Sequence, residues 1–123
     1  MFEIRTEMEF SAAHFHPDYP GKCSRLHGHN YKVVVYVRAE ELDKYGMVCD
    51  FFDIKGAVSK LIEQVDHTLL NEHNYFKDRH PSAENIAEFF FNEIKEPLTK
   101  DNHWLHAVEI WENNRSAARF IKN

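Results

Sequence analysis

Three histidines stand where two alternating polar and apolar segments meet. His27 and His29 begin the second segment, and His14 ends the first. Side chains at i and i+2 of a β-strand leave the same face about 6.5 to 7 Å apart, so one metal ion can bind both imidazoles of the His-x-His pair. If the segments pair antiparallel, His14 comes alongside. Three neutral imidazoles with an open fourth position are typical of catalytic zinc. The simpler interpretation is that they are only polar residues at strand ends.

A cysteine lies close to this set. Cys23 stands between Lys22 and Arg25 in the segment before His27. Positive neighbours lower the pKa of a thiol, so Cys23 is a candidate nucleophile or base; a fourth zinc ligand and an inert thiol are the alternatives. We favour the reactive thiolate, because a fourth protein ligand would close the coordination sphere. The other cysteine, Cys49, lies in an apolar run and is expected to be buried and inert.

An adjacent acid and imidazole form a second candidate group. Asp66 and His67 follow an amphipathic segment. A carboxylate beside an imidazole can raise its pKa and prepare it for proton transfer. Ordinary polarity at a helix end explains the pair equally well.

Two strands must position the histidines. Residues 2–14 and 27–39 alternate with period two, which predicts two half-buried strands joined by a loop rich in proline and glycine. A helix follows, for which Asp53 is the expected N-cap. Its apolar positions repeat at spacings of three and four: Ile54, Val58, Leu61, Ile62 and Val65.

The second half of the chain predicts one more helix and two more strands. Ser82 is the expected cap of a helix with an apolar stripe, which Pro97 helps to end. Residues 104–112 and 116–121 predict strands joined by a tight turn at Asn113 and Asn114. The predicted order of elements is ββααββ.

Composition limits the class of protein. The 123 residues are 43% hydrophobic, which fits a single domain over residues 1–123. A formal net charge of −5 argues against nucleic acid as a partner. No segment has the length and apolarity of a membrane span or the layout of a signal peptide, so we expect no membrane association and a cytoplasmic location.

The motifs together resemble the 6-pyruvoyl-tetrahydropterin synthase / 6-carboxytetrahydropterin synthase family over almost the whole chain. Three residues separate Cys23 from the His-Gly-His motif, which looks like the 6-carboxytetrahydropterin synthase branch of queuosine and deazapurine biosynthesis. The resemblance rests on these segments, in order: Phe10-Ser-Ala-Ala-His14, Cys23-Ser-Arg-Leu-His27-Gly-His29-Asn-Tyr, Met47-Val-Cys-Asp50-Phe, Asp66-His67-Thr-Leu-Leu-Asn71, Pro81-Ser-Ala-Glu84-Asn85-Ile-Ala and Trp111-Glu112.

The resemblance implies an α+β tunnelling fold (T-fold), in which each subunit packs a four-stranded antiparallel sheet against two helices. Trimers of this fold close their sheets into a barrel, and two trimers stack into a hexamer. It also implies a lyase that converts 7,8-dihydroneopterin triphosphate to 6-carboxy-5,6,7,8-tetrahydropterin with release of acetaldehyde and triphosphate. The alternatives are a 6-pyruvoyl-tetrahydropterin synthase, which eliminates triphosphate without losing carbon, and a non-catalytic zinc or pterin-binding module.

The same resemblance assigns roles to individual residues. His14, His27 and His29 would bind Zn²⁺, and Cys23 would act as general base. Asp66 and His67 would complete a proton relay, from a neighbouring subunit. Glu112 would anchor the pterin, because its carboxylate can accept from two parallel donors. Without the resemblance, Glu112 is better interpreted as a cross-strand partner of Arg115 or Arg119.

Several polar residues keep a weaker assignment. Asp50 is expected to cap or brace a turn. Candidate contacts of the triphosphate are Lys22, Arg25, Lys32 and Arg115, although such residues are usually solvated. Five histidines have no assigned role and are expected to be scattered over the surface: His16, His73, His80, His103 and His106.

Overall fold

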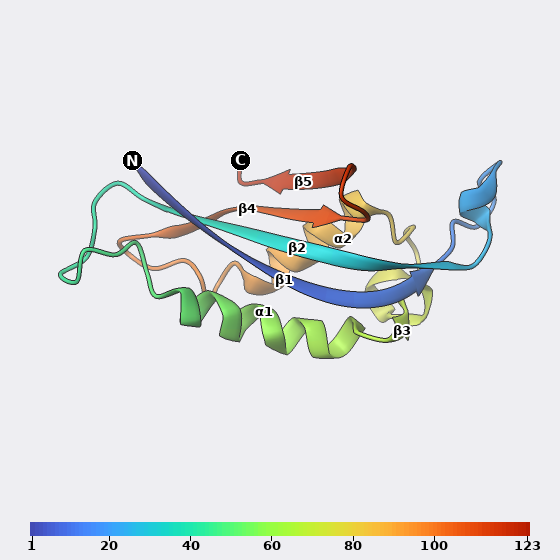
Figure 1. The fold of residues 1–123 in the computed structure, drawn as a ribbon, viewed down its shortest axis with the longest axis horizontal. Helices are drawn as coiled ribbons and strands as arrows, with labels where there is room; N and C mark the ends of the chain where they lie inside the picture. The colour runs from blue at the N-terminus through green and yellow to red at the C-terminus, as the bar shows by residue number, and fades with distance from the viewer.

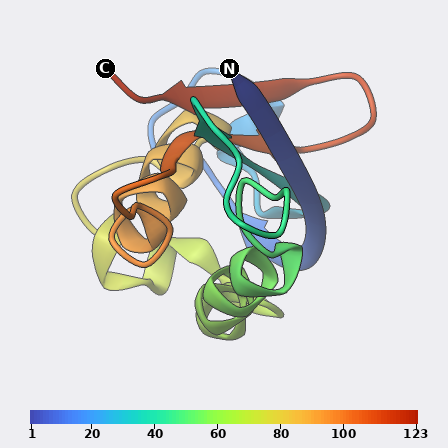
Figure 2. The same cartoon turned by 90° about the vertical axis from the view of Figure 1, so that its left-hand side faces the viewer.

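Two helices cover one face of a twisted sheet in the computed structural model, which describes residues 1–123 (Figures 1 and 2). The sheet has the strand order β3-β1-β2-β4-β5. Its strands are β1 (Phe2–His14), β2 (His27–Ala39), β3 (Thr68–Leu69), β4 (Trp104–Trp111) and β5 (Ala117–Ile121). The helices are α1 (Phe51–Val65) and α2 (Ala83–Ile94), and three short 3₁₀ turns lie at 22–24, 70–72 and 74–76.

The longest pairing joins β1 and β2 along their whole length. The register runs from Phe2 opposite Ala39 to His14 opposite His27 without a break. Both strands have the bounds that the alternation predicts. Side chains of one parity on β2, including Tyr31, Val33 and Val35, are almost fully buried beneath the helices. This pairing therefore sets the positions of His14 and His27, which form its last pair.

The sheet contains one strand more than the sequence indicates. The four long strands pair antiparallel, as predicted, and β4 and β5 begin and end within one residue of the predicted bounds. The two-residue strand β3 adds to the other edge of β1 in parallel orientation. Two residues carry no periodicity, and β3 forms because the chain leaving α1 lies beside β1, where the His67 N–H donates to the Ser11 carbonyl.

The helix caps show one wrong prediction and one confirmed prediction. Helix α1 begins at Phe51, and its N-cap is Asp50 rather than Asp53, because the Asp50 side chain accepts from the Phe52 N–H. Phe51 and Phe52 are exposed and lie outside the apolar stripe, so periodicity did not reveal this first turn. Helix α2 is capped by Ser82, as predicted.

A run of stacked aromatic rings leads through the core toward the three histidines. The Phe10 ring stacks on Phe90 of α2 at 5.5 Å and on Tyr31 of β2 at 4.9 Å between centroids. The Tyr31 hydroxyl lies 3.2 Å from Nδ1 of His14. The candidate site is therefore continuous with the packed interior. Neither helix combines the length and apolarity needed to cross a bilayer.

Candidate metal centre and its surroundings

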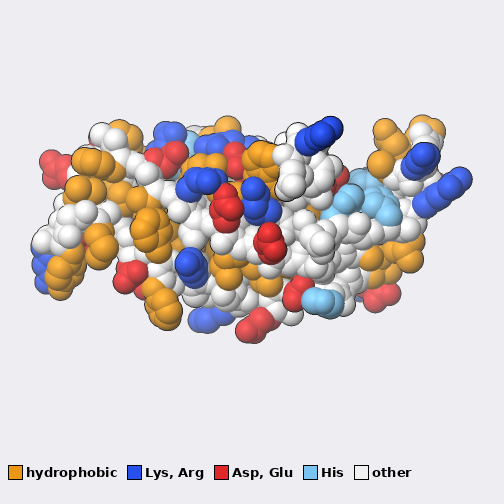
Figure 3. Space-filling model, viewed as in Figure 1, with side chains coloured by type: hydrophobic (Ala, Val, Ile, Leu, Met, Phe, Trp, Pro, Cys, Tyr) orange, Lys and Arg blue, Asp and Glu red, His pale blue; other side chains and the backbone are white.

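The strand register gathers the three histidines at one end of the sheet. His14 stands opposite His27, and His29 is two positions further along β2. One ring nitrogen from each lies within 4.8 Å of the others. In Figure 3, histidine side chains gather at this end, beside the projecting loop between β1 and β2. The fold therefore brings together the three histidines that the sequence predicts to lie side by side.

Backbone carbonyls orient two of these rings. His14 Nδ1 lies 2.8 Å from the carbonyl oxygen of Pro81, and His27 Nδ1 lies 2.7 Å from that of Arg25. A carbonyl only accepts, so each Nδ1 carries the hydrogen and each Nε2 presents a lone pair. The two Nε2 atoms are 2.9 Å apart. Two facing lone pairs repel each other unless a cation lies between them.

The third histidine has a ring nitrogen that nothing in the chain satisfies. Nε2 of His29 is buried and has no hydrogen-bond partner. Burial lowers the pKa of His29, and it lowers the pKa of His14 to about 4. Both rings are therefore neutral near pH 7, which is the form that binds metals. Convergent lone pairs and an unsatisfied buried nitrogen fit a divalent first-row transition metal.

A carboxylate stands at the edge of this cluster. Glu112 follows β4, and its Oε2 lies 4.0 Å from Nε2 of His29. The alternative interpretation, an ion pair of Glu112 with Arg115 or Arg119, is not observed, and Arg119 instead pairs with Glu109 at 2.7 Å. Glu112 also lines a small cavity of about 180 Å³ whose walls include Glu84.

The two cysteines differ in exposure, and Cys49 is buried as predicted. Cys23 is exposed in the 3₁₀ turn at 22–24, and its carbonyl accepts from the His16 N–H at 2.9 Å, which ties the loop to the end of β1. Its sulfur is not part of the three-histidine group. Cys49 is buried, and this burial raises the pKa of its thiol to about 11.

Asp66 and His67 form a contacting pair where α1 ends. Asp66 Oδ1 accepts from the Ser11 N–H at 2.9 Å and lies 3.0 Å from His67 Nδ1. The Ser11 N–H is the main reason that the pKa of Asp66 is below its ordinary value. His67 has a left-handed backbone (φ +58°), and 81% of its side chain is exposed. The ring borders a pocket that also reaches His29.

Two histidines without an assigned role lie next to the cluster. The His16 ring is 5.1 Å from that of His14 and stacks on His80 at 5.6 Å with an interplanar angle of 16°. The expectation of scattered surface histidines is therefore wrong for this pair. His16 follows His14 by two positions and therefore has the same parity. This signal could have indicated that His16 lies beside the cluster. No sequence pattern links His14 or His16 to His80.

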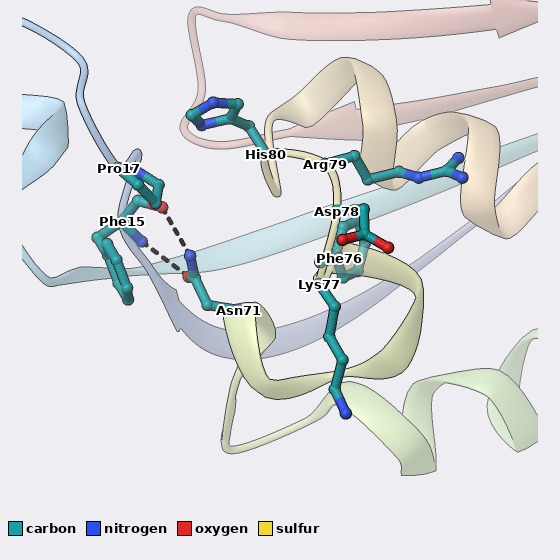
Figure 4. A pocket seen from close by; sticks show the side chains of 8 residues that line it. All are labelled: Phe15, Pro17, Asn71, Phe76, Lys77, Asp78, Arg79 and His80. Carbon is teal, nitrogen blue, oxygen red and sulfur yellow. Dashed lines mark hydrogen bonds between the residues drawn. The ribbon is translucent and has the colours of Figure 1, made fainter.

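One of the candidate triphosphate contacts, Lys32, is engaged with an aromatic ring. Lys32 lies over the Trp111 ring, 4.7 Å from its centroid. A pocket beside the loop is lined by two further cations, Lys77 and Arg79, whose side chains point away from each other (Figure 4). In the same view, the Asn71 side chain accepts a hydrogen bond from the Phe15 N–H at 3.0 Å and donates one to the Phe15 carbonyl at 2.9 Å. These two bonds anchor the chain just after β1.

Comparisons with known proteins agree on one family. Residues 3–123 match the family described as 6-pyruvoyl tetrahydropterin synthase. The 6-carboxy-5,6,7,8-tetrahydropterin synthase of Synechocystis sp. is 37% identical, over 98% of this chain and 94% of its own length. The enzyme of the same name from Haemophilus influenzae is 31% identical, over 98% of this chain and 99% of its own length. The structure of Caenorhabditis elegans 6-pyruvoyl tetrahydropterin synthase superposes with a TM-score of 0.88, at 28% identity, over 99% of this chain and 96% of that one.

Removing one imidazole should abolish metal binding. His27→Ala leaves two protein ligands, so the purified variant is expected to retain less than about a tenth of the metal of the unsubstituted chain, measured by plasma mass spectrometry after dialysis. His106→Ala, on β4 and outside the cluster, is the matched control and should keep its metal. Equal metal content in the His27 variant would show that the cluster is not the binding site.

Proposed function

Because the chain belongs to the 6-pyruvoyl tetrahydropterin synthase family, we propose that it is a zinc-dependent 6-carboxy-5,6,7,8-tetrahydropterin synthase of queuosine and deazapurine biosynthesis. Its substrate is 7,8-dihydroneopterin triphosphate, and its products are 6-carboxy-5,6,7,8-tetrahydropterin, acetaldehyde and triphosphate. The observation that carries the proposal is the convergence of three imidazole nitrogens in a chain whose relatives bear this name.

His14, His27 and His29 hold the zinc in this proposal. Bound zinc supplies a Lewis acid that acidifies substrate hydroxyls and stabilises negative charge that develops on them. The chain contributes neutral imidazoles, two of which are held in position by the carbonyls of Pro81 and Arg25. Such orienting contacts fix the tautomer and the direction of each ligand.

Glu112 is the proposed anchor of the pterin ring. The 2-amino group and the adjacent ring N–H of a pterin are parallel donors, and a carboxylate can accept both. Its carboxylate stands beside the cluster and is not engaged by Arg119, which supports this role.

Cys23 and the Asp66–His67 pair are the proposed proton-transfer groups. Cys23 is exposed and its sulfur stands apart from the histidine nitrogens, so it is free to act as a base. Asp66 is fixed by the Ser11 N–H and contacts Nδ1 of His67. This contact leaves Nε2 of an outward-facing ring available to exchange a proton, and we propose that the pair serves the site of a neighbouring subunit.

The reaction is tested by incubating the zinc-loaded protein with 7,8-dihydroneopterin triphosphate. Acetaldehyde is expected in equal amount to the 6-carboxy product, measured by coupled oxidation and by mass spectrometry. Triphosphate release without acetaldehyde would instead assign the pyruvoyl reaction, which retains all side-chain carbons. Binding of the pterin with no turnover would assign a non-catalytic module.

The role of the thiol is tested separately from the metal. Cys23→Ala should retain full zinc while turnover falls by about 10²–10⁴-fold, since that is what a positioned base typically contributes. Loss of zinc to the same extent as in His27→Ala would make the thiolate a fourth ligand. Full activity would transfer the base role to Asp66 and His67.

We also propose that the protein assembles into a trimer or hexamer. The sheet has two open edges, at β5 and beside the short β3, and strand edges of this kind favour pairing with another chain. Large apolar side chains are also exposed, including Leu42, Tyr45 and Phe52. Light scattering should give three or six times the chain mass of 14.6 kDa. A monodisperse monomer would contradict both the assembly and a shared site.

A further inference from the structure

We infer that Asn71 and Asn85 are positioning residues of the metal centre, and that together they hold the ring of His14 in the orientation of a ligand. Both asparagines belong to the motif segments of the sequence, and the proposed reaction assigns no role to either. The inference rests on the proposed function for the identity of the metal. The links from the two asparagines to His14 are hydrogen bonds of this chain and do not depend on that function.

His14 depends more on distant parts of the chain than His27 does. His14 is 1% exposed, and its Nδ1 lies 2.8 Å from the carbonyl oxygen of Pro81, which is 67 residues away in the sequence. The carbonyl that orients His27 belongs to Arg25, only two residues away. A shift of less than about 1 Å between the two segments would break the contact of His14, because a hydrogen bond is no longer made beyond about 3.5 Å. Both segments must therefore be held in place.

The side chain of Asn71 holds the residue that follows His14. It accepts from the Phe15 N–H at 3.0 Å and donates to the Phe15 carbonyl at 2.9 Å (Figure 4). A paired strand satisfies an edge residue in the same way with its main chain. Strand β3 ends at Leu69, so the amide of Asn71 continues the pairing beyond the end of that strand. One side chain thus sets the direction of the chain just beyond His14.

This attachment can be removed without altering the rest of the sheet edge. Three residues of one parity on this edge are joined to the segment that follows α1, namely Ser11, Ala13 and Phe15. The carbonyl of Ser11 accepts from a main-chain N–H, and Ala13 pairs with β3. The bonds to Phe15 come entirely from a side chain, so a substitution of Asn71 removes them and leaves the other two attachments in place.

Asn85, in the first turn of α2, holds the residues on both sides of Pro81. Its Nδ2 donates to the His80 carbonyl at 2.8 Å, and its main-chain N–H donates to Oγ of Ser82 at 3.1 Å. Proline has no N–H and its φ is fixed by the ring. The direction of the Pro81 carbonyl therefore depends on how its two neighbours are held, and the Asn85 side chain holds the one before it.

The two asparagines secure one contact from opposite sides. Asn71 holds the chain that carries His14, and Asn85 holds the chain that carries its acceptor. Without the carbonyl, the ring of His14 gains access to the other tautomer, in which Nε2 carries the hydrogen and presents no lone pair to a metal. The Tyr31 hydroxyl, 3.2 Å from the same Nδ1, does not replace the carbonyl, because a hydroxyl can donate as well as accept.

Zinc affinity, measured against a competing chelator, tests both roles without turnover. Loss of a group that orients a metal ligand typically costs about 10–100-fold in affinity, and the asparagines act one step further away. Asn71→Ala and Asn85→Ala should therefore each weaken zinc binding at least about threefold. Asn92→Ala, an exposed asparagine of α2, is the matched control and should change it by less than about twofold. Unchanged affinity in either variant would refute the role of that residue.

The tautomer of each ring in the metal-free protein separates positioning from a general loss of stability. Long-range ¹H–¹⁵N NMR spectra should show His14 with its hydrogen on Nδ1 in the unsubstituted protein and as a mixture of tautomers in both variants. The ring of His27, whose acceptor is local, should keep one tautomer throughout. An unchanged His14 ring, or an equal change at both rings, would overturn the inference.

Folding of at least one variant is favoured by its position. Asn85→Ala places the residue with the highest helix propensity in the first turn of α2, so this helix is expected to persist. Far-ultraviolet circular dichroism should match that of the unsubstituted protein. Failure of the acetaldehyde assay would overturn the proposed reaction and leave the measurements on the His14 ring unaffected.

Discussion

The pairing of β1 with β2 is the constraint on which the rest of the structure depends. Thirteen residues on each strand pair without a break, and the last pair is His14 with His27. A slip of one residue would turn one strand's apolar side chains out of the core and one or two of the imidazoles to the opposite face. The same apolar contacts that stabilise the sheet thus hold the three imidazoles in register.

This constraint explains why much of the fold and part of the site follow from the sequence. Period-two alternation predicts both strands, and matching parity places His14, His27 and His29 on one face. Such information is local, because each side chain's direction depends only on its position in a strand. The cap of α2 at Ser82 was equally local and was predicted correctly. The cap of α1 was not, since the helix begins with two exposed phenylalanines outside its apolar stripe.

The remaining features depend on contacts between distant parts of the chain. The carbonyl of Pro81 orients His14, His80 stacks on His16, and Glu112 approaches His29, across separations that no periodicity encodes. Strand β3 likewise exists only because α1 ends beside β1. For Glu112, the residues alone favoured an ion pair with an arginine. In the folded chain Arg119 pairs with Glu109 instead, and the Glu112 carboxylate lies beside His29.

The carbonyls that orient His14 and His27 have a consequence for how such a centre changes during evolution. Every residue type has a backbone carbonyl, so the orienting groups at positions 25 and 81 impose no direct requirement on the side chains there. What must persist is the path of the two loops. Substitutions at these positions can therefore accumulate while the orientation of the two imidazoles is inherited unchanged. A search for co-varying side-chain partners of His14 and His27 would miss the backbone groups that orient them.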